Sequence, residues 1–111
     1  MATKKMLEEE KRLNEIIYQN VSAGVKSKGI LMKDFEDSVG VGDGYFSRKR
    51  QGGIIPFIVV KTAAELLEMD LYALIDEKTA NVIAADELDR QIAEQTALLE
   101  SLKAKRAAYD A

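Results

Sequence analysis

The sequence predicts an all-α protein, in which five helices form a small domain and one long helix follows it. Apolar residues recur at steps of three and four along most of the chain, and no segment alternates between apolar and polar residues. Glycine or proline interrupts this pattern at short intervals up to residue 56, whereas none occurs after residue 79. With 111 residues, the chain has room for one compact domain and an extension.

The first predicted helix covers residues 4–28, and Gly29 lies just past its end, where glycine is a common stop signal. The charged run at residues 8–12 is expected to be a solvated face of this helix. A second helix is predicted over residues 31–39. The apolar face of the first helix carries Leu7, Leu13, Ile16, Ile17, Val21 and Val25, together with Asn20.

Three shorter helices are predicted next. One covers residues 44–51, with Asp43 as its N-cap and two glycines after it. Another covers residues 56–69 and begins at Pro56, since proline suits the first position of a helix. The fifth helix follows Asp70, which is expected to cap it.

The composition rules out several kinds of chemistry. The chain has no cysteine and no histidine, which excludes disulfides, thiolate zinc sites, cysteine nucleophiles and histidine acid–base catalysis. The glycines at positions 40, 42 and 44 faintly resemble a phosphate-binding loop but lack the lysine that should follow and the strand that should precede. We therefore expect no enzymatic activity, no cofactor and no metal site.

The charge is unevenly distributed. Residues 21–62 carry seven positive and four negative side chains, whereas residues 63–111 carry five positive and eleven negative ones, and the net charge is −3. The N-terminus lacks the apolar stretch of a signal peptide, and the longest apolar run, at residues 54–60, is too short to cross a bilayer. We expect a soluble, cytoplasmic protein without membrane contact.

The segment from Met32 to Gly52 has the pattern of a helix-turn-helix, in which a glycine is favoured at a turn with left-handed backbone. Placing the turn at Gly40 puts apolar residues at the positions that pack the two helices together. Frames on the next two glycines place aspartates there. The apolar residues of the Gly40 frame are Phe35, Val39, Val41 and Phe46.

Over residues 13–76 the sequence resembles the Cro/repressor-like family of helix-turn-helix regulators, also called the XRE family. The run Tyr45-Phe46-Ser47-Arg48, followed by Gly52, resembles the recognition helix and its closing turn. The fourth helix and the start of the fifth are matched at Pro56, Ala64, Leu67, Leu71 and Leu74. The resemblance implies a five-helix DNA-binding domain, regulation of transcription and binding to double-stranded DNA as a dimer.

The sequence departs from the family pattern at four positions. Glu36 stands where a small alanine is usual, and Gly42 replaces a serine or threonine. Lys49 replaces an apolar residue and Arg50 a glutamate, and both changes add positive charge that favours binding to phosphates.

The family geometry places the helix at residues 43–51 in the major groove, with its first residues at the base edges. Arg48 is the best candidate for a bidentate contact to guanine. The expected base contacts are Asp43, Gly44, Ser47 and Arg48, and the expected phosphate contacts are Lys28, Lys33, Tyr45, Lys49, Arg50 and Gln51. A dimer would join two half-sites roughly 34 Å apart, one turn of DNA.

A long helix is predicted over residues 79–109, and its apolar residues step alternately by four and three. This heptad pattern predicts a coiled-coil seam of two rows. The first row is Ala85, Ile92, Leu99 and Arg106, and the second row is Leu88, Gln95, Leu102 and Tyr109. We expect the seam to form a homodimer, parallel or antiparallel; the alternative is that the helix folds back on its own domain.

The expected organisation is therefore a helix-turn-helix domain at residues 1–76 and a dimerisation helix at residues 77–111. A second hypothesis keeps this scaffold but assigns it to protein interaction, with DNA binding lost. The net acidity and the departures at Glu36 and Lys49 favour that alternative. The sequence shows no ligand pocket.

Overall fold

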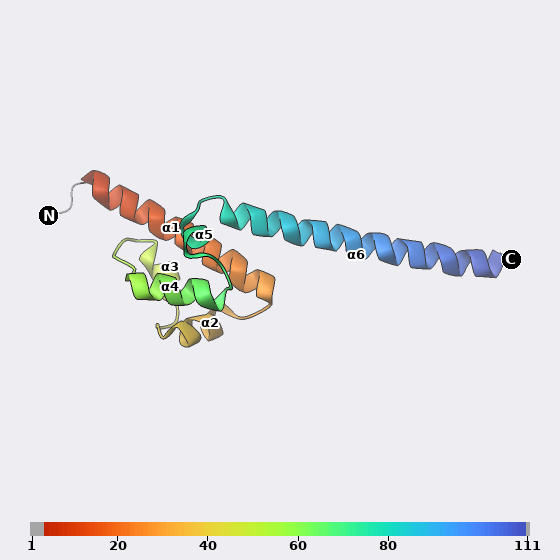
Figure 1. Ribbon diagram of the computed structural model, residues 1–111, viewed down its shortest axis with the longest axis horizontal. Helices are drawn as coiled ribbons and strands as arrows, with labels where there is room; N and C mark the ends of the chain where they lie inside the picture. Colours follow the sequence, from red (N-terminus) through yellow and green to blue (C-terminus); the bar gives the residue numbers. More distant parts are fainter. Residues whose placement is uncertain (1–3, 111) are drawn as a thin grey trace.

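The computed structural model describes residues 4–110, and this part of the chain is all-helical, with six helices and no strand. Five helices form a compact unit, and the sixth projects from it as a single rod (Figure 1). This rod gives the molecule its extents of 78 × 28 × 22 Å. In chain order the helices are α1 (Lys4–Lys28), α2 (Met32–Val39), α3 (Tyr45–Lys49), α4 (Phe57–Leu66), α5 (Leu71–Ile75) and α6 (Thr79–Asp110).

The core of the compact unit is built around α1. Three of its side chains, spaced four residues apart, form one buried stripe, as helical periodicity requires. Each of the four short helices α2 to α5 contributes at least one buried apolar residue to this core. The core consists of Ile17, Val21, Val25, Phe35, Phe46, Val60, Ala63, Ala64, Leu67 and Leu74. Leu7 and Leu13, expected on the same face of α1, lie beyond this core and remain exposed.

A buried asparagine connects α1 to the start of α6. The Asn20 amide group donates to the carbonyl oxygens of Leu74 and Asp76, each at 2.8 Å, and its side-chain oxygen accepts from the Ala80 amide at 2.9 Å. All three bonds satisfy a polar side chain that is almost fully buried. Asn20 therefore sets where α6 leaves the compact unit.

Helices α3 and α4 differ from the sequence prediction at both ends, and Pro56 is the N-cap of α4 rather than its first residue. Helix α4 ends at Leu66 rather than at residue 69, because Glu68 adopts a left-handed backbone (φ 57°) and the Met69 amide donates back to the Ala64 carbonyl at 2.9 Å. No glycine marks this stop. Helix α3 is shorter than residues 44–51 at both ends. The predicted cap of α5 is confirmed, since the Asp70 carboxylate accepts from the Tyr72 amide at 2.8 Å.

The sixth helix packs on the compact unit only near its start. From Leu88 onward every described side chain is exposed, and the Leu88, Ile92, Leu99 and Leu102 side chains are 52–57% exposed. In this chain α6 does not fold back on its own domain (Figure 1). The seam predicted from the heptads is therefore uncovered. Residues 1–3 and 111, which bound the predicted domains, lie outside the described part of the chain.

Candidate nucleic-acid interface

The turn between α2 and α3 is built on Gly40, as the sequence predicts. Gly40 has a left-handed backbone (φ 93°, ψ 24°), and its amide donates to the carbonyls of Glu36 and Asp37 at 3.0 and 3.1 Å. A Cβ added to Gly40 would meet no atom within 4 Å, so backbone conformation and not space favours glycine here. These bonds end α2 and turn the chain toward α3.

Two phenylalanines hold α2 and α3 together. The rings of Phe35 and Phe46 are both buried, and their centroids are 6.1 Å apart. Tyr45 meets Phe46 edge to face at 5.3 Å, and Val39 and Val41 pack against the same core. Aromatic packing therefore fixes α2 against α3, because tilted and edge-to-face ring pairs are favourable arrangements.

The carboxylate of Glu36 caps α3 from across the turn. Its two oxygens accept from the amides of Gly44 at 3.0 Å and Phe46 at 3.2 Å, and the residue is only 2% exposed. A buried negative charge is tolerated here because it meets unpaired amides at the positive end of a helix. Glu36, the departure from the family pattern, is therefore a structural cap.

The prediction that Asp43 caps α3 is wrong. The N-cap is Gly44, with a left-handed backbone (φ 75°), and no side chain at that position accepts a capping bond. Asp43 is exposed. The Glu36 carboxylate already accepts from the Phe46 amide, and the Tyr45 amide donates to the Gly42 carbonyl, so the two amides that an N-cap at position 43 would use are taken.

The four expected base contacts lie at the start and on the outer side of α3. Asp43, Ser47 and Arg48 are exposed, and Gly44 is half-buried. The Arg48 guanidinium folds back over the start of α3, where it donates to the Asp43 carbonyl. Arg48 must swing outward from this position to reach a base edge.

Two of the expected phosphate contacts already have ion-pair partners within the chain. Arg50 pairs with the Glu15 carboxylate at 2.8 Å and lies 4.5 Å above the Tyr18 ring. Lys28 pairs with Glu68 at 3.3 Å. These ion pairs leave Lys33, which is exposed, and the half-buried Lys49 as cations beside the turn and α3.

Tyr45, also expected at a phosphate, is half-buried. The ammonium of Lys49 lies 5.3 Å from the centre of its ring. Burial raises the pKa of the Tyr45 phenol above its ordinary value, so the phenol is neutral at pH 7 and can donate a hydrogen bond. Gln51, the last of the expected phosphate contacts, is exposed in the turn after α3.

Asn14 fixes the end of α3 against α1. Its amide group donates to the carbonyls of Lys49 at 2.9 Å and Gly53 at 2.6 Å, while the Gly53 amide donates to Glu10. The end of the candidate recognition helix is therefore held by a buried side chain that lies 35 residues earlier.

The structure adds a cation that the sequence analysis did not select. A polar hollow of about 420 Å³ between α1 and α3 is lined by Lys11, Glu15, Ser47, Arg50 and Gln51. Lys11 belongs to the run predicted to be only a solvated face. Lys11, Glu15 and Tyr18 follow one another at steps of four and three residues, so all three lie on one side of α1. This spacing is the sequence signal that could have identified Lys11.

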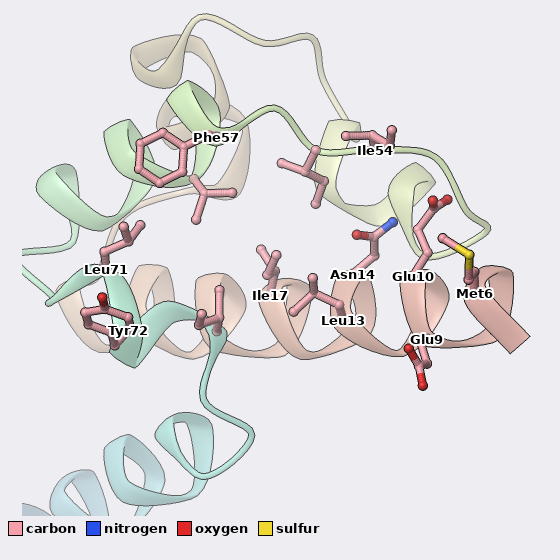
Figure 2. Close-up of a pocket in the computed structure, with 13 residues that line it drawn as sticks. Met6, Glu9, Glu10, Leu13, Asn14, Ile17, Ile54, Phe57, Leu71 and Tyr72 are labelled. Carbon is pink, nitrogen blue, oxygen red and sulfur yellow. The ribbon is translucent and has the colours of Figure 1, made fainter. Parts of the chain in front are cut away.

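A second concavity, an open apolar groove of about 650 Å³, lies between α1, the segment before α4, and α5 (Figure 2). Leu13, Asn14 and Ile17 rise from α1 on one side of it, and Ile54 and Phe57 face them from the other. Ile54, Phe57 and Tyr72 are 75%, 66% and 77% exposed. No pocket was predicted from the sequence, although residues of the apolar run at 54–60 form one wall.

Compared with known protein families, with curated proteins and with solved structures, the chain matches none. Within residues 4–110, none of the helices combines the length and apolar character that crossing a bilayer requires. The same residues include no cluster of side chains suited to hold a metal ion.

Proposed function

We propose that this protein is a sequence-specific DNA-binding regulator of the Cro/repressor-like, or XRE, helix-turn-helix type, in which α3 enters the major groove. The observation that carries the proposal is the unit formed by α2, the Gly40 turn and α3. Packing of Phe35 on Phe46 and the Glu36 cap hold this unit rigid, while Ser47 and Arg48 stay exposed on its outer side. A short, firmly held helix with exposed polar residues is what direct reading of base edges needs.

In this proposal Ser47 and Arg48 contact bases, with Asp43 and Gly44 beside them. Arg48 would exchange its bond to the Asp43 carbonyl for a bidentate contact to guanine. Asp43 would accept from a cytosine amino group.

The phosphate contacts of the proposal come from α1 as well as from α2 and α3. Lys33, Lys49 and Gln51 keep the roles expected from the sequence, and Lys11 joins them from α1. The ion pair between Arg50 and Glu15 does not prevent Arg50 from binding a phosphate, because an exposed pair of this kind contributes only about 0–1 kcal/mol.

The second part of the proposal is a homodimer formed through α6. A five-residue recognition helix makes few base contacts, so a second copy on the same DNA is needed for useful specificity. The exposed seam on α6 supports this, since it presents leucines and an isoleucine along one face without cover from its own chain.

Selection of bound sequences from random double-stranded DNA tests the proposal. We expect enrichment of a two-fold symmetric site, and loss of that enrichment in Arg48→Ala. The matched control is Arg90→Ala, which removes the same charge from α6, where Arg90 pairs with Glu87 outside the seam. Equal enrichment by Arg48→Ala and the unchanged protein would disprove the assignment of Arg48.

The second candidate function is a protein-interaction module on the same scaffold. The observation that favours it is that Arg50 and Lys28 are already paired with carboxylates, on a chain of net charge −3. Fluorescence polarisation at low salt separates the two functions. Absence of binding to any DNA fragment, at a concentration where sedimentation shows a dimer, would reject the DNA-binding proposal and favour this one.

A further inference from the structure

We propose that α6 pairs with α6 of a second copy in the antiparallel direction, in a register centred on Ala97. The inference rests on the homodimer of the proposed function and assigns its geometry. Its starting point is the uncovered seam, whose two rows run along a helix that no other part of the described chain covers beyond residue 88.

The composition of the two rows disfavours parallel pairing. In a parallel pair each residue of a row faces the same residue of the second copy. Arg106 would then meet Arg106, and two like charges would lie within the seam. Ala85 would meet Ala85 and leave the layer underfilled, because two methyl groups replace two large side chains.

Antiparallel pairing brings the first row of one copy against the second row of the other. With the centre at Ala97, Ala85 faces Tyr109 of the second copy, which joins a small residue to a large one. Ile92 faces Leu102, and Leu99 faces Gln95. Arg106 faces Leu88 of the second copy, so its apolar stem packs along this leucine while its charge reaches water. By symmetry each of these layers occurs twice.

The residues that flank the seam select the register. Asp89 and Lys103 each directly follow a second-row leucine, and in this register they face one another across the pair, twice. Leu98, which is 61% exposed, faces Leu98 of the second copy on the other flank. A shift of one heptad in either direction removes both pairs of Asp89 with Lys103.

The antiparallel register places the two compact units at opposite ends of the rod. Thr79 lies eighteen residues from Ala97, so the two copies of Thr79 are about 54 Å apart at 1.5 Å per residue. The expectation of half-sites one turn apart, roughly 34 Å, is therefore replaced. A single dimer would bind half-sites separated by more than one turn of DNA.

Cysteine cross-linking tests the direction of the pair, because the natural chain contains no cysteine. The variants Ile92→Cys and Leu102→Cys are prepared singly, mixed, unfolded and refolded together under reducing conditions, and then oxidised. We expect disulfide-linked dimers in the mixture and none in either single preparation. In the antiparallel pair two copies of residue 92 are about 15 Å apart along the axis, too far for a disulfide.

The control mixture combines Ala93→Cys, which lies outside the seam, with Leu102→Cys and is expected to give no linked dimer. Linked dimers in the single preparations would establish a parallel pair and overturn the proposal. A dimer by sedimentation that yields no disulfide in the mixture would overturn the register. A monomer at every concentration would overturn both the pairing and the proposed homodimer, whereas loss of DNA binding alone leaves the cross-linking result unchanged.

A charge exchange gives a second test that introduces no cysteine. Asp89→Lys places two lysines opposite one another and should weaken association several-fold, and adding Lys103→Asp to the same chain should restore it. Failure of the double variant to recover would contradict the pairing of Asp89 with Lys103.

Discussion

The two long helices, α1 with 25 residues and α6 with 32, differ in what covers their apolar faces. Side chains from four other helices of the same chain cover the central face of α1, whereas the seam of α6 is open. The stability of α1 is therefore a property of one chain. A single exposed helix gains little from burial, so in the proposed homodimer the stability of α6 would depend on association and on protein concentration.

This difference shows that apolar periodicity predicts a helix but does not predict what covers its apolar face, the same chain or another one. Ile17 and Val21 on α1 and Ile92 and Leu99 on α6 give similar local signals in the sequence. What separates the helices is how the rest of the described chain packs. The short helices pack their apolar residues around α1, whereas no described side chain covers α6 from residue 88 onward.

The largest expected effect belongs to the core around α1. Phe46→Ala removes a fully buried ring and should lower the free energy of unfolding by about 3–5 kcal/mol. Urea denaturation monitored by tyrosine fluorescence measures the loss. Ile58→Ala, at a side chain 63% exposed, is the control and should change it by less than about 0.5 kcal/mol. Similar losses in both variants would contradict the assignment of the core.

A smaller effect is expected at the α3 cap. Glu36→Ala leaves one buried and one half-buried amide unpaired and should destabilise the compact unit by about 1–3 kcal/mol. Asp43→Ala is the matched control, because the structure gives Asp43 no capping role. If Asp43→Ala proved the more damaging substitution in the same denaturation experiment, the cap would have to be reassigned from Glu36 to Asp43.

The seam of α6 should respond differently. Ile92→Asp should weaken association tenfold or more, about 1.4 kcal/mol, while the unfolding of the compact unit stays unchanged. Sedimentation and the loss of helical circular dichroism on dilution measure the two properties separately. Ala93→Asp, one residue outside the seam, should leave both unchanged. If Ile92→Asp also lowered the free energy of unfolding of the compact unit, the proposed independence of α1 and α6 would be wrong.

The smallest effect concerns pH. Because burial raises the pKa of Tyr45, the folded state favours the neutral phenol. Its contribution to stability is complete below the ordinary tyrosine pKa of 10.0 and is lost as pH rises through the higher pKa of the folded state. Denaturation between pH 9 and 11 should show a shallower loss in Tyr45→Phe than in Tyr72→Phe, whose ring is 77% exposed. Equal slopes would show that Tyr45 plays no part in the loss.

Local signals made much of the fold predictable. Gly29 and Gly40 end helices through their backbone conformation, and Asp70 caps α5 through a bond to a residue two positions away. These features depend on near neighbours. The predicted boundaries therefore agree with the structure to within one residue for α1, α2 and α6, and α5 begins directly after its predicted cap.

Features that depend on distant residues were not predictable in this way. Glu36 reaches amides eight and ten residues away, and Asn14 and Asn20 bond to carbonyls more than 30 residues away. The ion pair of Arg50 with Glu15 likewise joins two helices. At the candidate site, the exposed residues of α3 could be predicted from the sequence. The side chains that hold α3 in place, and the carboxylate of Glu15 that pairs with Arg50, could not.

The bonds of Asn20 make the junction between the compact unit and α6 stiff, because they tie the end of α5, the linker at Asp76 and the first turn of α6 to one side chain of α1. Stiffness at a junction limits how far two linked binding sites can move relative to each other. A pair of copies joined through α6 would accordingly accept few changes in the number of base pairs between its two sites. In the proposed dimer, the side chain of one buried asparagine would thereby influence which spacings between half-sites are tolerated.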